Sequence, residues 1–349
     1  MAAPTKLTVV ISQGQSKNPA KQALEENIAA ALLMEPGIDL SVVPHLYDLA
    51  EGHTGLMFLR SVRSDMVVLS WLFPRAAHWT LDRFGVKGKV GEVQLVKPKD
   101  DADDDEEDAD DHAGEKKPTL GAAGAADRTI YALDLRDFDD PDLYVKEIRR
   151  IAALAKPKDG PRMFVDLSGW LKGAPNPAAL ERASRPEPDL PVIKAEDLLK
   201  APERRWYPVI DYSRCTNCME CIDFCLFGVY GVDKADRINV ENQDNCRKGC
   251  PACSRVCPEH AIIFPQHKSA AIAGDEVAGP GGLKIDLSRL FGGPSAVDIA
   301  ARERDEQLVA VGRDAVGLSV GIPKRQAGKP KGPKDELDKL ADALDDLEL

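Results

Sequence analysis

The positions of the cysteines constrain this chain more than any other feature of its sequence. All eight cysteines of the 349 residues lie between Cys215 and Cys257. They form two runs of four with neighbours three or four positions apart: Cys215, Cys218, Cys221 and Cys225, then Cys246, Cys250, Cys253 and Cys257. Three thiolates at this spacing can come from one tight turn and hold one side of a metal cluster. A fourth thiolate must then come from elsewhere in the chain.

The two runs are an internal duplication. The last three cysteines of the second run each follow their counterparts by 32 residues, and Cys246 follows Cys215 by 31. Short β-prone segments flank each run, at 208–211 and 229–232 in the first copy and at 237–240 and 261–264 in the second. The sequence therefore predicts two similar halves, each with a cysteine run between two short strands.

Disulfides and structural zinc are the alternative uses of so many cysteines. A disulfide framework is typical of small secreted chains, and we expect neither a signal peptide nor a membrane span here, because no apolar stretch is long enough. Structural zinc uses Cys-x-x-Cys pairs separated by a longer finger, without runs of three. The pattern favours iron–sulfur ligation over both.

Because of this cysteine pattern, residues 206–265 resemble a bacterial-type ferredoxin domain with two 4Fe-4S clusters. We place the domain at 206–268, which is less than a fifth of the chain. The resemblance implies a small α+β iron–sulfur fold. In that family the fourth cysteine of each run ligates the other cluster. The implied ligands are Cys215, Cys218, Cys221 and Cys257 for cluster 1, and Cys225, Cys246, Cys250 and Cys253 for cluster 2.

Two departures from the family pattern are local. The family has proline after the fourth cysteine of the first run, where this chain has Leu226, whereas Pro258 follows the second run. Three residues, rather than two, separate Cys246 from Cys250. Gly249 can adopt the positive φ that would close this longer turn.

The charge of the chain is concentrated in one insert. The formal net charge is −12, and residues 100–111 contain ten acidic residues, which leaves −2 for the rest. A block of like charge repels itself and stays solvated, so we predict a disordered acidic insert at about 97–127, with docking of a basic partner as the alternative. We expect no nucleic-acid partner.

Strand and helix patterns alternate in the N-terminal part. Apolar runs predict strands at 6–11, 38–43, 66–71 and 129–134, with a further strand-like run at 163–167; amphipathic patterns predict helices at 19–34, 55–63 and 142–155. This alternation is typical of βαβ crossovers. We therefore predict an α/β domain with a mostly parallel sheet at 1–170.

The loop after the first predicted strand is a candidate anion site. It is small and polar and precedes a helix N-terminus; its candidate residues are Ser12, Gly14, Ser16 and Asn18. It weakly resembles the phosphate loop of flavodoxin-like flavin reductases, and 70–74 lies where such folds place a flavin-contacting loop. The resemblance implies a flavodoxin-like α/β domain that binds flavin mononucleotide (FMN), and an empty scaffold or partner platform is the alternative. The scattered histidines, His45 among them, have no paired metal spacing and are interpreted as surface or turn residues.

The remaining segments predict a connector and a C-terminal extension. A proline-rich linker is predicted at 171–205. In the extension, 269–349, Ser295 is expected to cap a helix over 295–311. Leu337, Leu340, Leu344 and Leu347 share one face of an amphipathic tail that packs on its own chain or docks on another subunit.

The function expected from these patterns is single-electron transfer at low potential by a soluble, cytoplasmic protein, to or from a partner oxidoreductase. Apolar neighbours of the cysteines are expected to exclude water; they are Ile222, Phe224, Phe227, Val256 and Ile262. No catalytic acid, base or nucleophile constellation stands out, so an electron carrier is favoured over a stand-alone catalyst. The alternatives are a flavin-dependent oxidoreductase with FMN in the N-terminal domain, and a regulatory or assembly protein with structural clusters.

Overall fold

The computed structural model describes residues 6–97, 119–120, 128–154, 203–275 and 295–321. These residues form two compact units. The first contains 6–97, 128–154 and 203–204, and the second contains 119–120, 205–275 and 295–321. The predicted acidic run, the strand-like run at 163–167, the linker at 171–202 and the leucine-rich tail lie outside the described residues.

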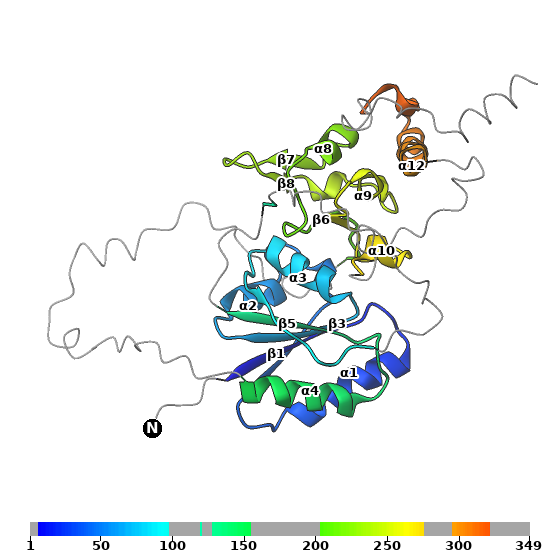
Figure 1. Cartoon of the computed structure of the whole chain (residues 1–349). Helices are drawn as coiled ribbons and strands as arrows, with labels where there is room; N and C mark the ends of the chain where they lie inside the picture. Colours follow the sequence, from blue (N-terminus) through cyan, green and yellow to red (C-terminus); the bar gives the residue numbers. More distant parts are fainter. Residues whose placement is uncertain (1–5, 98–118, 121–127, 155–202, 276–294, 322–349) are drawn as a thin grey trace, which may run out of the picture. The chain divides into compact units, whose positions relative to one another are not determined.

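The first unit is an α/β domain built on a parallel sheet (Figure 1). Its strands lie in the order β2-β1-β3-β5-β4, and every pairing between them is parallel. The strands are β1 (Leu7–Ser12), β2 (Ile38–Val43), β3 (Met66–Ser70), β4 (Lys89–Val90) and β5 (Thr129–Asp134). All residues of β1 and β3 are buried, which explains their nearly continuous apolar sequences, because both faces of a parallel sheet are covered.

Helices cover both faces of this sheet. Figure 1 shows α1 (Pro19–Leu32) and α4 (Pro141–Leu154) on one side and α2 (Thr54–Ser61) and α3 (Pro74–Arg83) on the other. The core between the sheet and the α1–α4 layer includes Val9, Ile11 and Ile28, which are at most 1% exposed. The Asn18 side chain accepts a hydrogen bond from the Ala20 N–H, and Pro19 occupies the first turn of α1. The predicted α/β domain, its four strands and its three helices are confirmed.

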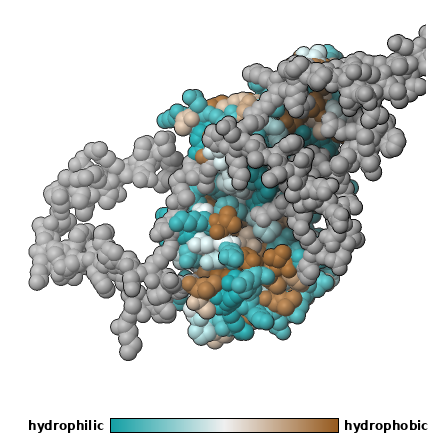
Figure 2. All heavy atoms as spheres, viewed as in Figure 1, coloured by the Kyte–Doolittle hydropathy of each residue, from teal (hydrophilic) through white to brown (hydrophobic). Residues whose placement is uncertain are grey.

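Helix α3 and strand β4 of the first unit were not predicted. Helix α3 begins at Pro74, the last residue of the stretch interpreted as a loop, and eight of its ten residues are buried, including Arg75 and Asp82. Strand β4 has only two residues, fewer than a periodic pattern needs. On the face seen in Figure 2, hydrophobic residues of this unit lie in separate groups among hydrophilic ones, as on an ordinary protein surface.

The second unit contains two small antiparallel sheets, one in which β6 (Val209–Ile210) pairs with β9 (Ile262–Ile263) and one in which β7 (Tyr230–Val232) pairs with β8 (Ile238–Val240). All four strands fall in the predicted β-prone segments. Helix α9 (Ala252–Val256) begins 32 residues after α8 (Glu220–Phe224), so the duplication of the cysteine runs extends to the helices.

The C-terminal helix belongs to the same unit as the cysteines. Helix α12 (Ala296–Ala310) is capped by Ser295, whose side chain accepts from the Asp298 N–H while the Asp298 carboxylate accepts from the Ser295 N–H. The predicted cap and helix are confirmed. Val297 and Ala300 of α12 pack in one cluster with residues of α8 and α9. Helix α10 (Ala270–Ala273) follows β9.

Candidate metal centre

Unusual backbone conformations shape the turns that carry the cysteines. Asn217 and Met219 adopt φ values of 59° and 64° between the first three cysteines, a left-handed conformation that non-glycine residues adopt infrequently. The Asn217 amide anchors this turn, because it donates to the Asp236 carbonyl at 2.7 Å and accepts from the Ile238 N–H at 3.0 Å. In the second run Gly249 has φ 88°. The expected positive φ at this glycine is confirmed.

All eight cysteines are free thiols, and Cys215, Cys221, Cys250, Cys253 and Cys257 are buried. Cys221 lies in α8 and Cys253 in α9, whereas Cys225 and Cys257 are the C-cap residues that directly follow these two helices. Each run therefore ends in a thiol that leaves its turn at the end of a short helix.

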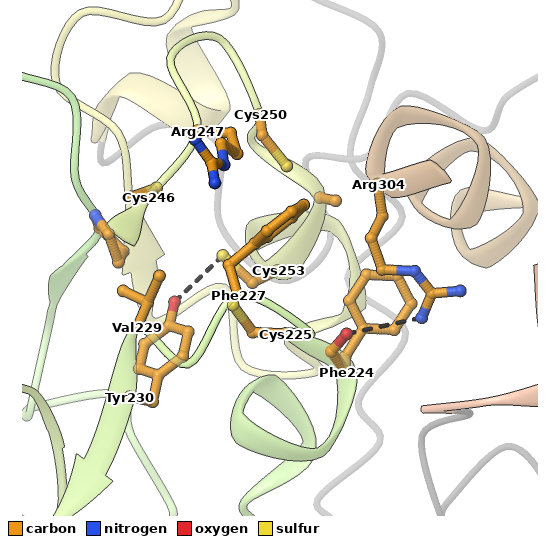
Figure 3. Close-up of a pocket in the computed structure, with 12 residues that line it drawn as sticks. Phe224, Cys225, Phe227, Val229, Tyr230, Cys246, Arg247, Cys250, Cys253 and Arg304 are labelled. Atoms are coloured by element: carbon orange, nitrogen blue, oxygen red, sulfur yellow. Dashed lines mark hydrogen bonds between the residues drawn. The ribbon is translucent and has the colours of Figure 1, made fainter. Parts of the chain in front are cut away.

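One cavity brings together thiols from both runs. Figure 3 shows Cys225 of the first run with three cysteines of the second run, Cys246, Cys250 and Cys253, around the same space. This space amounts to about 330 Å³, including the part that opens to solvent. We call these four cysteines the second set.

The electrostatic neighbours of the thiols divide the cysteines in the same way. Burial raises the pKa of Cys253 well above its ordinary value, and neighbouring Cys225, Cys246 and Cys250 raise it further. Burial likewise raises the pKa of Cys221 well above its ordinary value, with further contributions from Cys257, Cys218 and Cys215. We call the last four the first set. Each set therefore combines three cysteines of one run with the fourth cysteine of the other.

Hydrogen-bond donors point at several sulfurs. The Tyr230 hydroxyl donates to Cys253 Sγ at 3.0 Å, and the Ala261 N–H donates to Cys257 Sγ at 3.2 Å. Burial raises the pKa of Cys225, whereas backbone donors at the next residues, Phe227 to Val229, lower it. Such donors stabilise negative charge on sulfur, as ligand thiolates require.

Apolar side chains enclose the cysteines. Of the five residues expected to exclude water, Phe224, Val256 and Ile262 are at most 2% exposed, and Ile222 and Phe227 are half-buried. Leu120, which lies in the predicted insert, also packs against this core and donates its N–H to the Cys215 carbonyl at 2.9 Å.

The thiols are not gathered as ligands of a single ion. Within the described ranges, no group of three or more His, Cys, Asp or Glu side chains has the arrangement that would hold one metal ion. A cubane requires wider spacing, because its irons and sulfides lie between the thiolates. The donor set, eight cysteine sulfurs in two groups of four, is the chemistry that two such clusters use.

The residues of the predicted flavin loop are engaged with their own chain. The Gly14 N–H donates to Glu25 Oε1 at 2.7 Å, and the same oxygen accepts from Trp71 Nε1 at 2.6 Å. A Cβ at Gly14 would lie 2.9 Å from Trp71 Nε1, so the indole closes over the loop. Ser12 accepts from the Leu46 N–H, Ser16 accepts from the Asn18 N–H, and Asn18 caps α1. The Glu25 carboxylate already accepts the Gly14 N–H and would repel a phosphate, so this loop does not fit FMN.

Some residues around the candidate metal centre and elsewhere were missed by reasoning from the sequence. Tyr230 and Arg304 line the cavity of the second set, and no periodicity or motif connects them to the cysteines. His45, interpreted as a surface or turn residue, is buried at 8% exposure beside Asp48.

Within the described part of the chain, no helix combines the length and apolar character needed to cross a membrane. No protein-family model, curated protein or solved structure matches this chain.

Proposed function

We propose that the second unit binds two 4Fe-4S clusters and that the protein transfers single electrons to or from a partner oxidoreductase. One observation carries the proposal: Cys225 of the first run shares a cavity with Cys246, Cys250 and Cys253 of the second run. This exchange of the fourth cysteine between two duplicated runs is the ligand pattern of two-cluster ferredoxins.

The surroundings of the thiols support the same proposal. Buried sulfurs with N–H and O–H donors directed at them, as at Cys253 and Cys257, provide the hydrogen bonds and low solvent exposure that set cluster potentials. The two small antiparallel sheets and the repeated helices α8 and α9 fit a ferredoxin-like α+β fold. Free thiols throughout fit a reducing compartment such as the cytoplasm.

The first unit is proposed to be a flavodoxin-like scaffold. The strand order of its sheet begins β2-β1-β3, as in flavodoxin-like sheets. It then departs from that order, because β5 lies between β3 and β4. Because the Gly14 N–H is bonded to Glu25, the described residues do not favour a flavin enzyme. We assign the electron chemistry to the second unit alone.

The test is a reductive titration of the full chain, purified without oxygen. A brown protein that takes up one electron per cluster from dithionite, and returns them to a mild oxidant, is the expected result. Clusters that are present but cannot be reduced and reoxidised would instead indicate a structural role. Yellow flavin absorbance beside the cluster band would indicate the flavin enzyme.

A further inference from the structure

A buried arginine lies beside the second set. Arg304, on α12, is 1% exposed and lines the cavity with Cys225, Cys246, Cys250 and Cys253 (Figure 3). A buried guanidinium is costly unless it is hydrogen-bonded. The chain must therefore hold this cation in place with specific partners.

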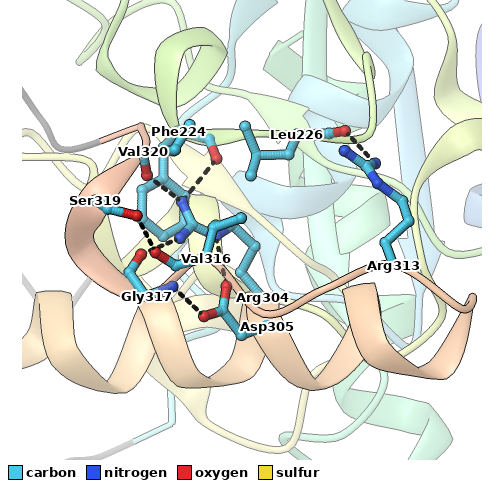
Figure 4. Close-up of polar contacts among 9 residues, drawn as sticks. All are labelled: Phe224, Leu226, Arg304, Asp305, Arg313, Val316, Gly317, Ser319 and Val320. Carbon is cyan, nitrogen blue, oxygen red and sulfur yellow. Dashed lines mark hydrogen bonds and ion pairs between the residues drawn. The ribbon is translucent and has the colours of Figure 1, made fainter.

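Carbonyl groups from two separate segments supply these partners (Figure 4). Nη1 donates to the Val320 carbonyl at 3.0 Å and to the Phe224 carbonyl at 3.5 Å, and Nη2 donates to the Gly317 carbonyl at 2.5 Å. The guanidinium also lies 4.5 Å from the centre of the Phe224 ring. Carbonyls satisfy the donors without cancelling the positive charge.

One carboxylate lies next to this arginine. Arg304 Nε donates to Asp305 Oδ1 at 3.2 Å, while Asp305 Oδ2 accepts from the Gly317 N–H at 2.6 Å. Asp305 does not line the cavity, whereas Arg304 does. Arg304 is therefore the member of the pair that borders the cavity of the second set.

The charges that act on the two sets differ. Arg304 is the buried charged side chain that lines the cavity of the second set. The other charged side chains that act on the second set are Arg247, which is exposed, and Glu303, which is paired with Arg255 at 2.8 Å. The charged side chains that act on the first set, at Cys215, are Asp211 and Arg237, which have opposite signs. Among the described residues of the second unit, Arg304 is the only buried cation, and it lines the cavity of the second set.

We propose that Arg304 raises the reduction potential of the cluster bound by the second set above that of the cluster bound by the first set. The first electron that enters the protein then resides on the cluster of the second set. The inference rests on the proposed function. One electron from a low-potential one-electron donor adds one negative charge there; no bond forms or breaks and no proton moves. Arg304 stabilises that charge across an interior where water screens it little.

The experiment is a potentiometric titration of the full chain, followed by electron paramagnetic resonance. Arg304→Met should lower the potential of one component and leave the other unchanged. Arg302→Met removes the same charge from an exposed position on the same helix, and should change neither at high salt, because salt screens exposed charges. A Cys250→Ser variant, through an altered or missing signal, identifies which component belongs to the second set.

Two further variants separate charge from structure. Arg304→Lys keeps the charge and should keep the potential close to that of the native protein, even if stability falls. Asp305→Asn removes the neighbouring negative charge and should raise the potential of the second set, the opposite sign to Arg304→Met. The inference would be overturned if Arg304→Met shifted the potentials of both components equally or shifted only that of the first set. It would also be overturned if either Arg304→Met or Asp305→Asn left both potentials unchanged. A native protein without bound iron would refute the proposed function itself.

Discussion

The Tyr230 hydroxyl donates a hydrogen bond to Cys253 Sγ at 3.0 Å in the interior of the second unit. Burial raises the pKa of Tyr230 well above its ordinary value, and the thiols of Cys253, Cys221 and Cys225 raise it further. The phenol thus keeps its proton and remains a donor. Cys221 belongs to the first set and the other two to the second, so Tyr230 lies near both.

Replacing Tyr230 with phenylalanine should lower the reduction potential of the second set, because the sulfur loses a donor that stabilises added negative charge. The variant should also lose about 1 kcal/mol of stability, the usual net contribution of one hydrogen bond. Potentiometry and chemical denaturation check the two effects. Tyr212→Phe is the matched control, since its hydroxyl donates to the Ile238 carbonyl; it should change stability without changing the potential.

The crossed sets make a reciprocal prediction. Cys225→Ala should perturb the cluster of the second set and spare the first, because Cys225 lines the cavity with Cys246, Cys250 and Cys253. Cys257→Ala should do the reverse. Mössbauer or paramagnetic resonance spectra of the two variants distinguish the clusters. Loss of the first cluster in Cys225→Ala, with the second intact, would mean that each run forms a site of its own.

Much of the fold could be predicted from the sequence because many of its strands and helices have strong local sequence patterns. The buried runs of β1 and β3 and the capped helix at Ser295 have signals that lie within a few residues. Helix α3 was missed because Pro74 ends a stretch that reads as a loop, and its charged residues, Arg75 and Asp82, are buried by tertiary packing.

The duplication predicted two similar halves, and the crossed division of the cysteines followed only from the resemblance to two-cluster ferredoxins. Contacts across long sequence separations were not predictable. Arg304 and Phe224 are 80 residues apart, and no residue pattern near either indicates the other. The same applies to Glu25 and Trp71, whose hydrogen bond spans 46 residues. A short polar sequence of this kind suits a phosphate-binding loop and also a loop that bonds to a glutamate of its own chain. Only the tertiary contact with Glu25 distinguishes the two.

The Glu25 contacts predict a protein that does not bind FMN. Released flavin, measured by fluorescence after denaturation, should be absent, and added FMN should not bind. Glu25→Ala should cost about 1–3 kcal/mol of stability, because two donors, the Gly14 N–H and Trp71 Nε1, lose their acceptor. Glu26→Ala, at an exposed neighbouring position, should cost little. Stoichiometric FMN in the purified native protein would contradict this interpretation of the loop.

His45 predicts a loss of stability in mild acid. Burial lowers the pKa of His45 below 6.5; Asp48 opposes the shift, and Arg204 adds to it. Below about pH 6.5, His45 therefore binds a proton more readily in the unfolded chain than in the folded chain. The free energy of unfolding decreases as the pH falls below this value, by at most about 1.4 kcal/mol per pH unit. Urea unfolding between pH 7 and 5 measures the slope. His45→Gln should flatten it, and Asp48→Asn should steepen it; equal slopes in all three proteins would contradict the assignment.

The most direct measurement is the number of iron and acid-labile sulfide atoms per chain in protein purified without oxygen. Two sets of four cysteine ligands predict about eight of each. Cys225→Ala and Cys257→Ala should each keep at least the four irons of the unaffected set. About four irons in the native protein, or zinc in place of iron, would contradict the two-cluster account.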